Sequence, residues 1–341
     1  MKIPEQPRYE RTMRAAKAFL KQERITEFPI DVFEIARRNG WVLVSYSDLM
    51  DSLKVNLNAV IHRMGSRDGA TFRQHGLYFI AYNDRVKSPG RIRFTIAHEI
   101  GHIYLNHLVH FERTRITRLG LTPSEMEVLE NEADCFARNV LSPSTIVKFL
   151  QLREANQLIK PFGLSFKAAR TRLNFLRCDH ETPFNFLLGQ AWPYLKRIRF
   201  GKQCGRCGHS FVSVNDGVVF CPICGNADRI ERSDEGPKVI YDGYELNEEG
   251  YPIHECPRCG NEELRGYEFC TICGTQLFNR CTNFSRDLEL HLIFDRNLDG
   301  QARYCSRCGA ESAYFKEKLL RPWHVVKKEL GAEQKSDSFP R

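Results

Sequence analysis

Ten of the chain's 13 cysteines stand in five CxxCG units, and all five units lie after residue 200. Two cysteines at this spacing can hold one zinc ion across a tight turn, and the following glycine tolerates a positive φ there. In a reducing compartment the pattern indicates metal binding rather than disulfides. Of the other three cysteines, Cys135 and Cys178 are expected to be small buried residues. The 341 residues therefore divide into a cysteine-poor part and a part built around metal ions.

Four of the units pair into two complete ligand sets at the spacing of zinc ribbons, and we expect one structural zinc ion in each. The sets are Cys204, Cys207, Cys221 and Cys224, and Cys256, Cys259, Cys270 and Cys273. The fifth unit, Cys305 and Cys308, has only Cys281 as a further thiolate. His291 is a candidate fourth ligand of this third site. The equal alternative is a degenerate ribbon without metal.

Charge is divided as unequally as the cysteines. Residues 1–200 hold 31 Lys+Arg and 20 Asp+Glu, a net +11, whereas residues 201–341 hold 19 and 22, a net −3. Each four-thiolate zinc site adds about −2 more. An acidic cysteine-rich part disfavours nucleic acid as its main partner. The chain shows neither a secretory signal nor a run of about 18 apolar residues, so we expect a cytoplasmic protein without a membrane segment.

The first part reads as α+β. Ser88 followed by Pro89 predicts the start of one long helix, and Thr122, Pro123 and Glu125 predict a capping box at the start of a second. Further helices are predicted near 8–22, after Asp31, and over 164–176. β-branched and aromatic runs predict strands over 41–46, 57–63 and 76–83.

The domains are expected to follow this division of the chain. They are an α+β domain over 1–180, a linker over 181–200, zinc ribbons over 201–235 and 250–280, a degenerate ribbon over 281–320, and a C-terminal tail over 321–341.

The first long helix carries titratable residues inside an otherwise apolar run, RFTIAHEIGHIYLNH. His98 and His102 are four residues apart, so they share a helix face with Cβ atoms about 6 Å apart and can bind one zinc ion. Glu99 is placed to act as a general base on zinc-bound water. Burying these groups without partners or a metal would be costly.

A catalytic zinc ion needs a third protein ligand, and the second long helix offers one in LENEAD. Glu130 and Asp134 lie four residues apart on one stripe. We expect Glu130 to be the ligand and Asp134 to orient a histidine N–H. Glu132 is the rival ligand and points about 160° away on a straight helix. Glu132 and Glu127 are therefore assigned to an exposed charged face.

HEIGH, followed about thirty residues later by ENEADCFARNVLSP, resembles the ImmA/IrrE family of zinc metallopeptidases. FPIDVFEIARRNGWVLVSY and GLYFIAYNDRVKSPGRIRFTIAHE are also similar, so the resemblance covers about residues 10–175. It implies that His98, His102 and Glu130 bind zinc and that Glu99 is the general base. The expected fold is a metallopeptidase domain in which a small sheet packs an HExxH helix and a glutamate-bearing helix, followed by zinc-ribbon modules. The segment 140–143 departs from the paired leucine common in the family, which affects packing only.

The resemblance also implies a function: zinc-dependent cleavage of a regulatory protein, a helix-turn-helix transcriptional repressor of a mobile element or stress regulon. The ribbons would dock this substrate or another partner. The alternative is a non-proteolytic regulator or sensor that binds protein or nucleic acid, against which the intact Glu99 argues. A coincidental HExxH is disfavoured by the second motif. The oxyanion-stabilising residue stays open among His62, Tyr104, His107 and His110.

Overall fold

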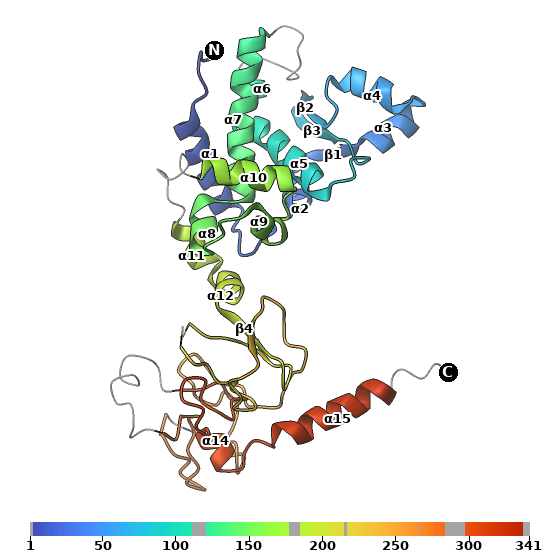
Figure 1. The fold of residues 1–341 in the computed structure, drawn as a ribbon. Coiled ribbons are helices and arrows are strands. Elements are labelled where there is room, and N and C mark those ends of the chain that lie inside the picture. Colours follow the sequence, from blue (N-terminus) through green and yellow to red (C-terminus); the bar gives the residue numbers. More distant parts are fainter. Residues whose placement is uncertain are drawn as a thin grey trace. The chain divides into compact units, whose positions relative to one another are not determined.

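The structure, a computed structural model, describes residues 3–110, 121–176, 185–214, 217–264, 266–283 and 297–336 (Figure 1). It forms two compact units, Met1–Leu195 and Lys196–Arg341, here called the N-terminal unit and the cysteine-rich unit. Among the residues described, no helix combines the length and the apolar character that crossing a bilayer requires.

Twelve helices and three strands precede Gly201 in the part of the chain that the structure describes. The helices are α1 (Tyr9–Gln22), α2 (Val32–Arg38), α3 (Tyr46–Leu53), α4 (Leu57–Met64), α5 (Pro89–Tyr104), α6 (His107–His110), α7 (Pro123–Leu141), α8 (Ser144–Phe149), α9 (Ala155–Phe162), α10 (Phe166–Phe175), α11 (Asn185–Gln190) and α12 (Trp192–Phe200). The strands are β1 (Val42–Ser45), β2 (Gly69–Gln74) and β3 (Leu77–Tyr82). This mixture agrees with the expected α+β class.

The three strands form one small sheet in the order β1-β3-β2, with β1 parallel and β2 antiparallel to β3. Paired Ala70 and Ala81 lie in an apolar cluster with side chains of α3 and α4. Because side chains alternate along a strand, the neighbouring residue Thr71 faces the other side. There its hydroxyl donates to Glu99 of α5. The sheet therefore separates α3 and α4 from the HExxH helix.

One strand predicted from sequence is wrong, because residues 57–64 form α4. The side chain of Asn56 caps this helix by accepting from the Ala59 N–H, and Gly65 ends it with φ +70°. The third strand is instead β2, which turns into β3 through His75 and Gly76, both with positive φ. Two central residues with positive φ are typical of a tight hairpin.

The two long helices begin where their sequence signals predict. The Ser88 side chain accepts from the Arg91 N–H at the start of α5, and Thr122 and Glu125 form the capping box of α7. The helices pack side by side (Figure 1). At Gly101 a Cβ atom would stand only 3.3 Å from the Ala133 Cα atom, so a residue without a side chain permits this close approach. The packing brings the two motif-bearing helices together.

In the described residues after Phe200, the cysteine-rich unit has a three-stranded antiparallel sheet in the order β5-β4-β6 and two helices. These elements are β4 (Gly201–Cys204), β5 (Ser210–Val212), β6 (Ile230–Arg232), α14 (Ala313–Lys316) and α15 (Trp323–Ser336). Two expectations differ from this structure. The expected linker is largely helical, as α11 and α12, and the expected tail forms α15, whose Val326 packs against the first cysteine set.

Backbone hydrogen bonds join the first and third cysteine segments. The N–H groups of Arg303 and Tyr304 donate to the carbonyl oxygen of Pro222, at 2.8 and 2.9 Å. The Phe220 N–H donates to the Ser306 carbonyl oxygen at 2.9 Å. The third segment therefore packs with the first in one body, which differs from the expected row of separate ribbons.

Candidate active site

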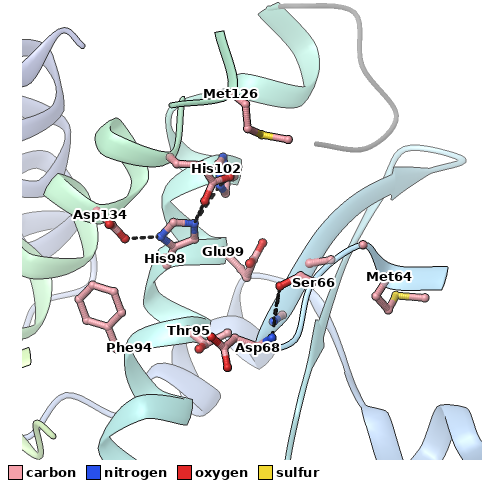
Figure 2. A pocket seen from close by; sticks show the side chains of 14 residues that line it. Met64, Ser66, Asp68, Phe94, Thr95, His98, Glu99, His102, Met126 and Asp134 are labelled. Carbon is pink, nitrogen blue, oxygen red and sulfur yellow. Dashed lines mark hydrogen bonds and ion pairs between the residues drawn. The ribbon is translucent and has the colours of Figure 1, made fainter. Parts of the chain in front are cut away.

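Helices α5 and α7 bring two imidazoles and one carboxylate to a common point. His98 Nε2 lies 3.1 Å from His102 Nε2 and 3.2 Å from Glu130 Oε2. His102 Nε2 lies 3.6 Å from Glu130 Oε1. His98 and His102 project from the same face of α5 into a pocket (Figure 2). The residues named from the sequence are thus together in space.

The spacing of these donor atoms fits a zinc ion. Ligand atoms about 2.0–2.2 Å from a tetrahedral zinc ion stand about 3.3–3.6 Å apart, close to the distances found here. Two imidazoles and a carboxylate are also a ligand set that leaves a fourth position for water or substrate. The pocket beside them, of about 400 Å³, provides room for it. His98, His102 and Glu130 could therefore hold a catalytic metal ion.

Asp134 supports this centre from α7. Its Oδ1 lies 2.7 Å from His98 Nδ1, as Figure 2 shows. Burial would lower the pKa of His98, but the hydrogen bonds to Asp134 and Glu130 outweigh it and raise this pKa well above its usual value. Burial would likewise raise the pKa of Glu130, yet hydrogen bonds to the two histidines hold it well below its usual range. The Asp134 hydrogen bond therefore orients the His98 ring within the ligand cluster.

Glu99 lies in the same pocket but outside the ligand cluster. It is 6% exposed, and its Oε2 accepts a hydrogen bond from Thr71 Oγ1 at 2.6 Å. The strand β2 approaches α5 closely here, since a Cβ on Gly69 would stand 2.5 Å from Thr95 Cγ2. Thr71 and Gly69 were missed from the sequence, because only the strand's register places them against the helix.

The assignment of Glu132 to an exposed face is wrong. Its side chain is 1% exposed, and its carboxylate accepts from the backbone N–H and the guanidinium of Arg8. Oε2 also lies 3.0 Å from His107 Nε2. Burial would raise the pKa of Glu132, but hydrogen bonds from Arg8 and His107 outweigh it and lower this pKa to about 2. Glu127 is exposed, as expected.

Among the candidates for oxyanion stabilisation, His107 is fully buried and 2.9 Å from His102, Nδ1 to Nδ1. Burial lowers its pKa to about 4, although Glu132 acts to raise it. The Tyr104 hydroxyl donates to Gln22, and His62 lies on α4. Neither of these two lines the pocket. The structure describes the backbone of His110 but not its side chain.

The two cysteine tetrads are brought together as expected. Within the first set, Sγ–Sγ distances are 3.6 Å for Cys204 and Cys224 and 3.4 Å for Cys207 and Cys221. Thiolates bound tetrahedrally to zinc stand about 3.8 Å apart. In the second set the distances are 3.6 Å for Cys256 and Cys273 and 3.7 Å for Cys259 and Cys270. Both sets are compatible with zinc.

All five CxxCG turns share one backbone geometry. In each, the glycine N–H donates to the carbonyl oxygen of the first cysteine at 2.8–3.1 Å, and the glycine φ lies between +66° and +81°. The turn of Cys305 and Cys308 is no exception. Cys281 joins it, with its Sγ 3.4 Å from that of Cys308. These three thiolates could hold a metal ion.

Two candidates named from the sequence, His291 and Cys178, fall outside the residues that the structure describes. Cys135 is fully buried on α7, as expected.

Comparison with known proteins adds a family-level result. No curated protein matches the chain. Residues 53–174, which carry β2, β3, α5 and α7, match the family model described as the IrrE N-terminal-like domain, a peptidase family. The match includes His98, Glu99, His102, Glu130 and Asp134, and it supports a metallopeptidase-type function for this part of the chain.

Proposed function

We propose that the protein is a zinc-dependent endopeptidase that cleaves a regulatory protein. One observation carries the proposal: His98, His102 and Glu130 converge within 4.8 Å of one another beside a pocket that also holds Glu99. The three ligands leave a position open, and the carboxylate beside them is held by a hydrogen bond. This combination is that of a hydrolytic centre rather than a structural one.

Each side chain has a distinct task in the proposed reaction. A zinc ion held by His98, His102 and Glu130 would polarise the scissile carbonyl and lower the pKa of a water molecule towards about 7. Glu99 accepts the proton of the attacking water and passes it to the leaving amine. Thr71 fixes the Glu99 carboxylate, and Asp134 fixes the His98 ring.

A second pocket supports a peptide as substrate. It has a volume of about 200 Å³ and shares Phe94 and Asp134 with the first. Its lining includes Leu141, Leu164 and Phe175, so it suits an apolar side chain next to the scissile bond. We propose a helix-turn-helix transcriptional repressor as the substrate, with the cysteine-rich unit as its docking surface. Such docking would raise the local concentration of substrate at the active site.

The test is co-incubation of the zinc-loaded protein with the transcriptional repressor encoded nearest to it, followed by mass spectrometry of the products. Wild type should cut one peptide bond, and Glu99→Gln should reduce the rate by about 10²- to 10⁴-fold, because it removes the base. Glu127→Gln, on an exposed position of α7, is the matched control and should cut normally.

Cleavage that survives Glu99→Gln would contradict the mechanism. Tight binding of the repressor without cleavage by the zinc-loaded wild type would contradict the peptidase and favour the non-proteolytic regulator.

A further inference from the structure

A line of hydrogen-bonded polar side chains, of which only Arg8 is partly exposed, runs from Arg8, the residue before α1, to His102 of α5. Arg8 donates to Glu132 through its backbone N–H, Nε and Nη2 at 2.7, 2.8 and 2.9 Å. Glu132 lies 3.0 Å from His107, and His107 lies 2.9 Å from His102. Glu132, His107 and His102 are each at most 2% exposed. The line therefore links residues 94 positions apart, and its three inner side chains are shielded from water.

The chemistry of the groups sets the direction of each hydrogen bond. The Glu132 carboxylate accepts three hydrogen bonds from Arg8 and forms an ion pair with it, so it also acts as the acceptor toward His107, and His107 Nε2 carries a hydrogen. In a neutral imidazole the other nitrogen then presents a lone pair, and His107 Nδ1 accepts from His102 Nδ1–H. A neutral His102 can then bind a metal ion only through Nε2, the nitrogen that faces His98 and Glu130.

Asp134 produces the same result for the other imidazole. Its carboxylate accepts from His98 Nδ1–H, so a neutral His98 can bind a metal ion only through Nε2. The two histidines thus reach one tautomer by different routes. His98 uses one carboxylate four residues along the helix from Glu130, and His102 uses an imidazole backed by a carboxylate and an arginine.

Local backbone geometry makes the second route available. Asn106 has φ +57°, and this left-handed residue separates α5 from α6. Asparagine adopts that conformation more readily than most residues. The turn places His107, the first residue of α6, against His102. Arg8 precedes α1, which packs on α7, and lies outside the segment that matches the IrrE N-terminal-like domain.

We propose that His107, Glu132 and Arg8 are positioning residues that hold His102 in its metal-binding tautomer, so that the N-terminal helix is part of the metal centre. This inference rests on the proposed zinc site. Because the outer partners of a metal-binding histidine fix its ring and tautomer, their loss weakens metal binding without removing a ligand.

The first test measures zinc affinity at this centre by competition with a chelator, in protein whose cysteine sites stay loaded. His107→Phe keeps a ring but removes both nitrogens, and zinc affinity should fall about 10- to 100-fold. His107→Gln can still accept from His102 and donate to Glu132, so it should stay within about threefold of wild type. Equal affinity of His107→Phe and wild type would overturn the proposal.

If His107→Phe fails to fold, a second pair of variants with smaller structural changes, Arg8→Met and Arg14→Met, tests the same inference. Arg8 is 27% exposed, and Arg8→Met leaves its backbone N–H bond to Glu132 intact. It should weaken zinc binding by about 3- to 10-fold, below the loss expected for removing a direct partner of the histidine. Arg14→Met, on the exposed side of the same helix, should change nothing. Identical affinities for the two variants would overturn the part assigned to Arg8.

A second readout needs neither zinc nor activity. Nitrogen-15 NMR of labelled histidines, in protein freed of zinc at this centre, should show a hydrogen on Nδ1 of His102 and on Nε2 of His107. A His102 ring whose Nδ1 carries no hydrogen would overturn the proposal. A protein that binds zinc here and cuts nothing would refute the peptidase but leave this inference intact, whereas unchanged affinities in an active peptidase would do the reverse.

Discussion

The centre in the N-terminal unit and the cysteine centres differ in how their ligands are held. His98, His102 and Glu130 lie on two helices that are stabilised by capping and by packing against each other. Polar side chains outside the ligand cluster hold the rings of the two histidines. The cysteines of the second unit sit in short turns, where the glycine N–H bonds back to the first cysteine. The first centre therefore lies on helices whose formation does not depend on it.

The cysteine centres, in contrast, form part of the core of their unit. The first tetrad, all of it buried, forms one apolar cluster with Ile223, Tyr241 and Val326. The strands around it are only three or four residues long. Four thiolates also complete a tetrahedron and leave no position for substrate. The comparison predicts that removing metal from the first unit would cost activity, whereas removing it from the second would cost structure.

The largest effect should come from breaking a tetrad. Cys221→Ser should lose one zinc ion and unfold the cysteine-rich unit, because structural zinc binding contributes roughly 10–16 kcal/mol to folding in small zinc modules. Zinc analysis and hydrogen exchange measure this. The N-terminal unit should keep its protection. A folded second unit without that zinc ion would break the comparison.

The next effect separates the two acids of α7. Glu130→Ala should weaken zinc binding at the His98 and His102 centre more than 100-fold without unfolding its unit, since it removes a ligand. Glu132→Ala should cost about 10- to 100-fold, because it acts through His107. Chelator competition gives both values. The reverse ranking would show that Glu132 is the ligand.

A smaller effect tests the packing that creates the first centre. Gly101→Val places methyl groups where even a Cβ would stand 3.2 Å from Phe136 Cδ1 and 3.3 Å from Ala133. We expect a loss of about 1–3 kcal/mol in the free energy of unfolding, as for other overpacked cores. Chemical denaturation of the N-terminal unit measures it. Unchanged stability would mean that α5 and α7 are not held as closely as described.

The smallest predicted effect separates zinc binding from the catalytic step, and it comes from the hydrogen bond between Thr71 and Glu99. Thr71→Val removes the hydroxyl that donates to Glu99, and kcat should fall roughly tenfold because a hydrogen bond to a charged group contributes about 1.5 kcal/mol or more. Zinc affinity should not change, and Thr71→Ser should restore kcat. A variant that loses zinc instead would place Thr71 in the metal centre.

Local patterns predicted a large share of this site. The four-residue spacings of His98 with His102 and of Glu130 with Asp134 act within one helix, where periodicity alone decides which side chains share a face. The helix starts at Ser88 and Thr122 follow from capping by neighbouring residues. Features decided within one or two helical turns are therefore readable from the sequence.

The wrong or missing predictions concern residues whose environment depends on contacts outside their own local segment. Glu132 reads as a surface acid until α1 brings Arg8 to it, 124 residues away in the chain. Residues 57–64 carry apolar side chains that suit a strand, and the caps Asn56 and Gly65 make them a helix. Thr71 becomes part of the site only through the register of β2 against β3. Tertiary contacts of this kind leave no local periodic signal.

The central claim is that one divalent ion is held by two imidazoles of α5 and one carboxylate of α7. Anomalous diffraction at the zinc edge, from crystals of the zinc-loaded protein, tests it most directly. We predict a peak about 2.0–2.2 Å from His98 Nε2, His102 Nε2 and a Glu130 oxygen, in addition to the peaks in the two tetrads. Peaks in the tetrads alone, or a histidine-bound peak coordinated by Glu132, would contradict the account.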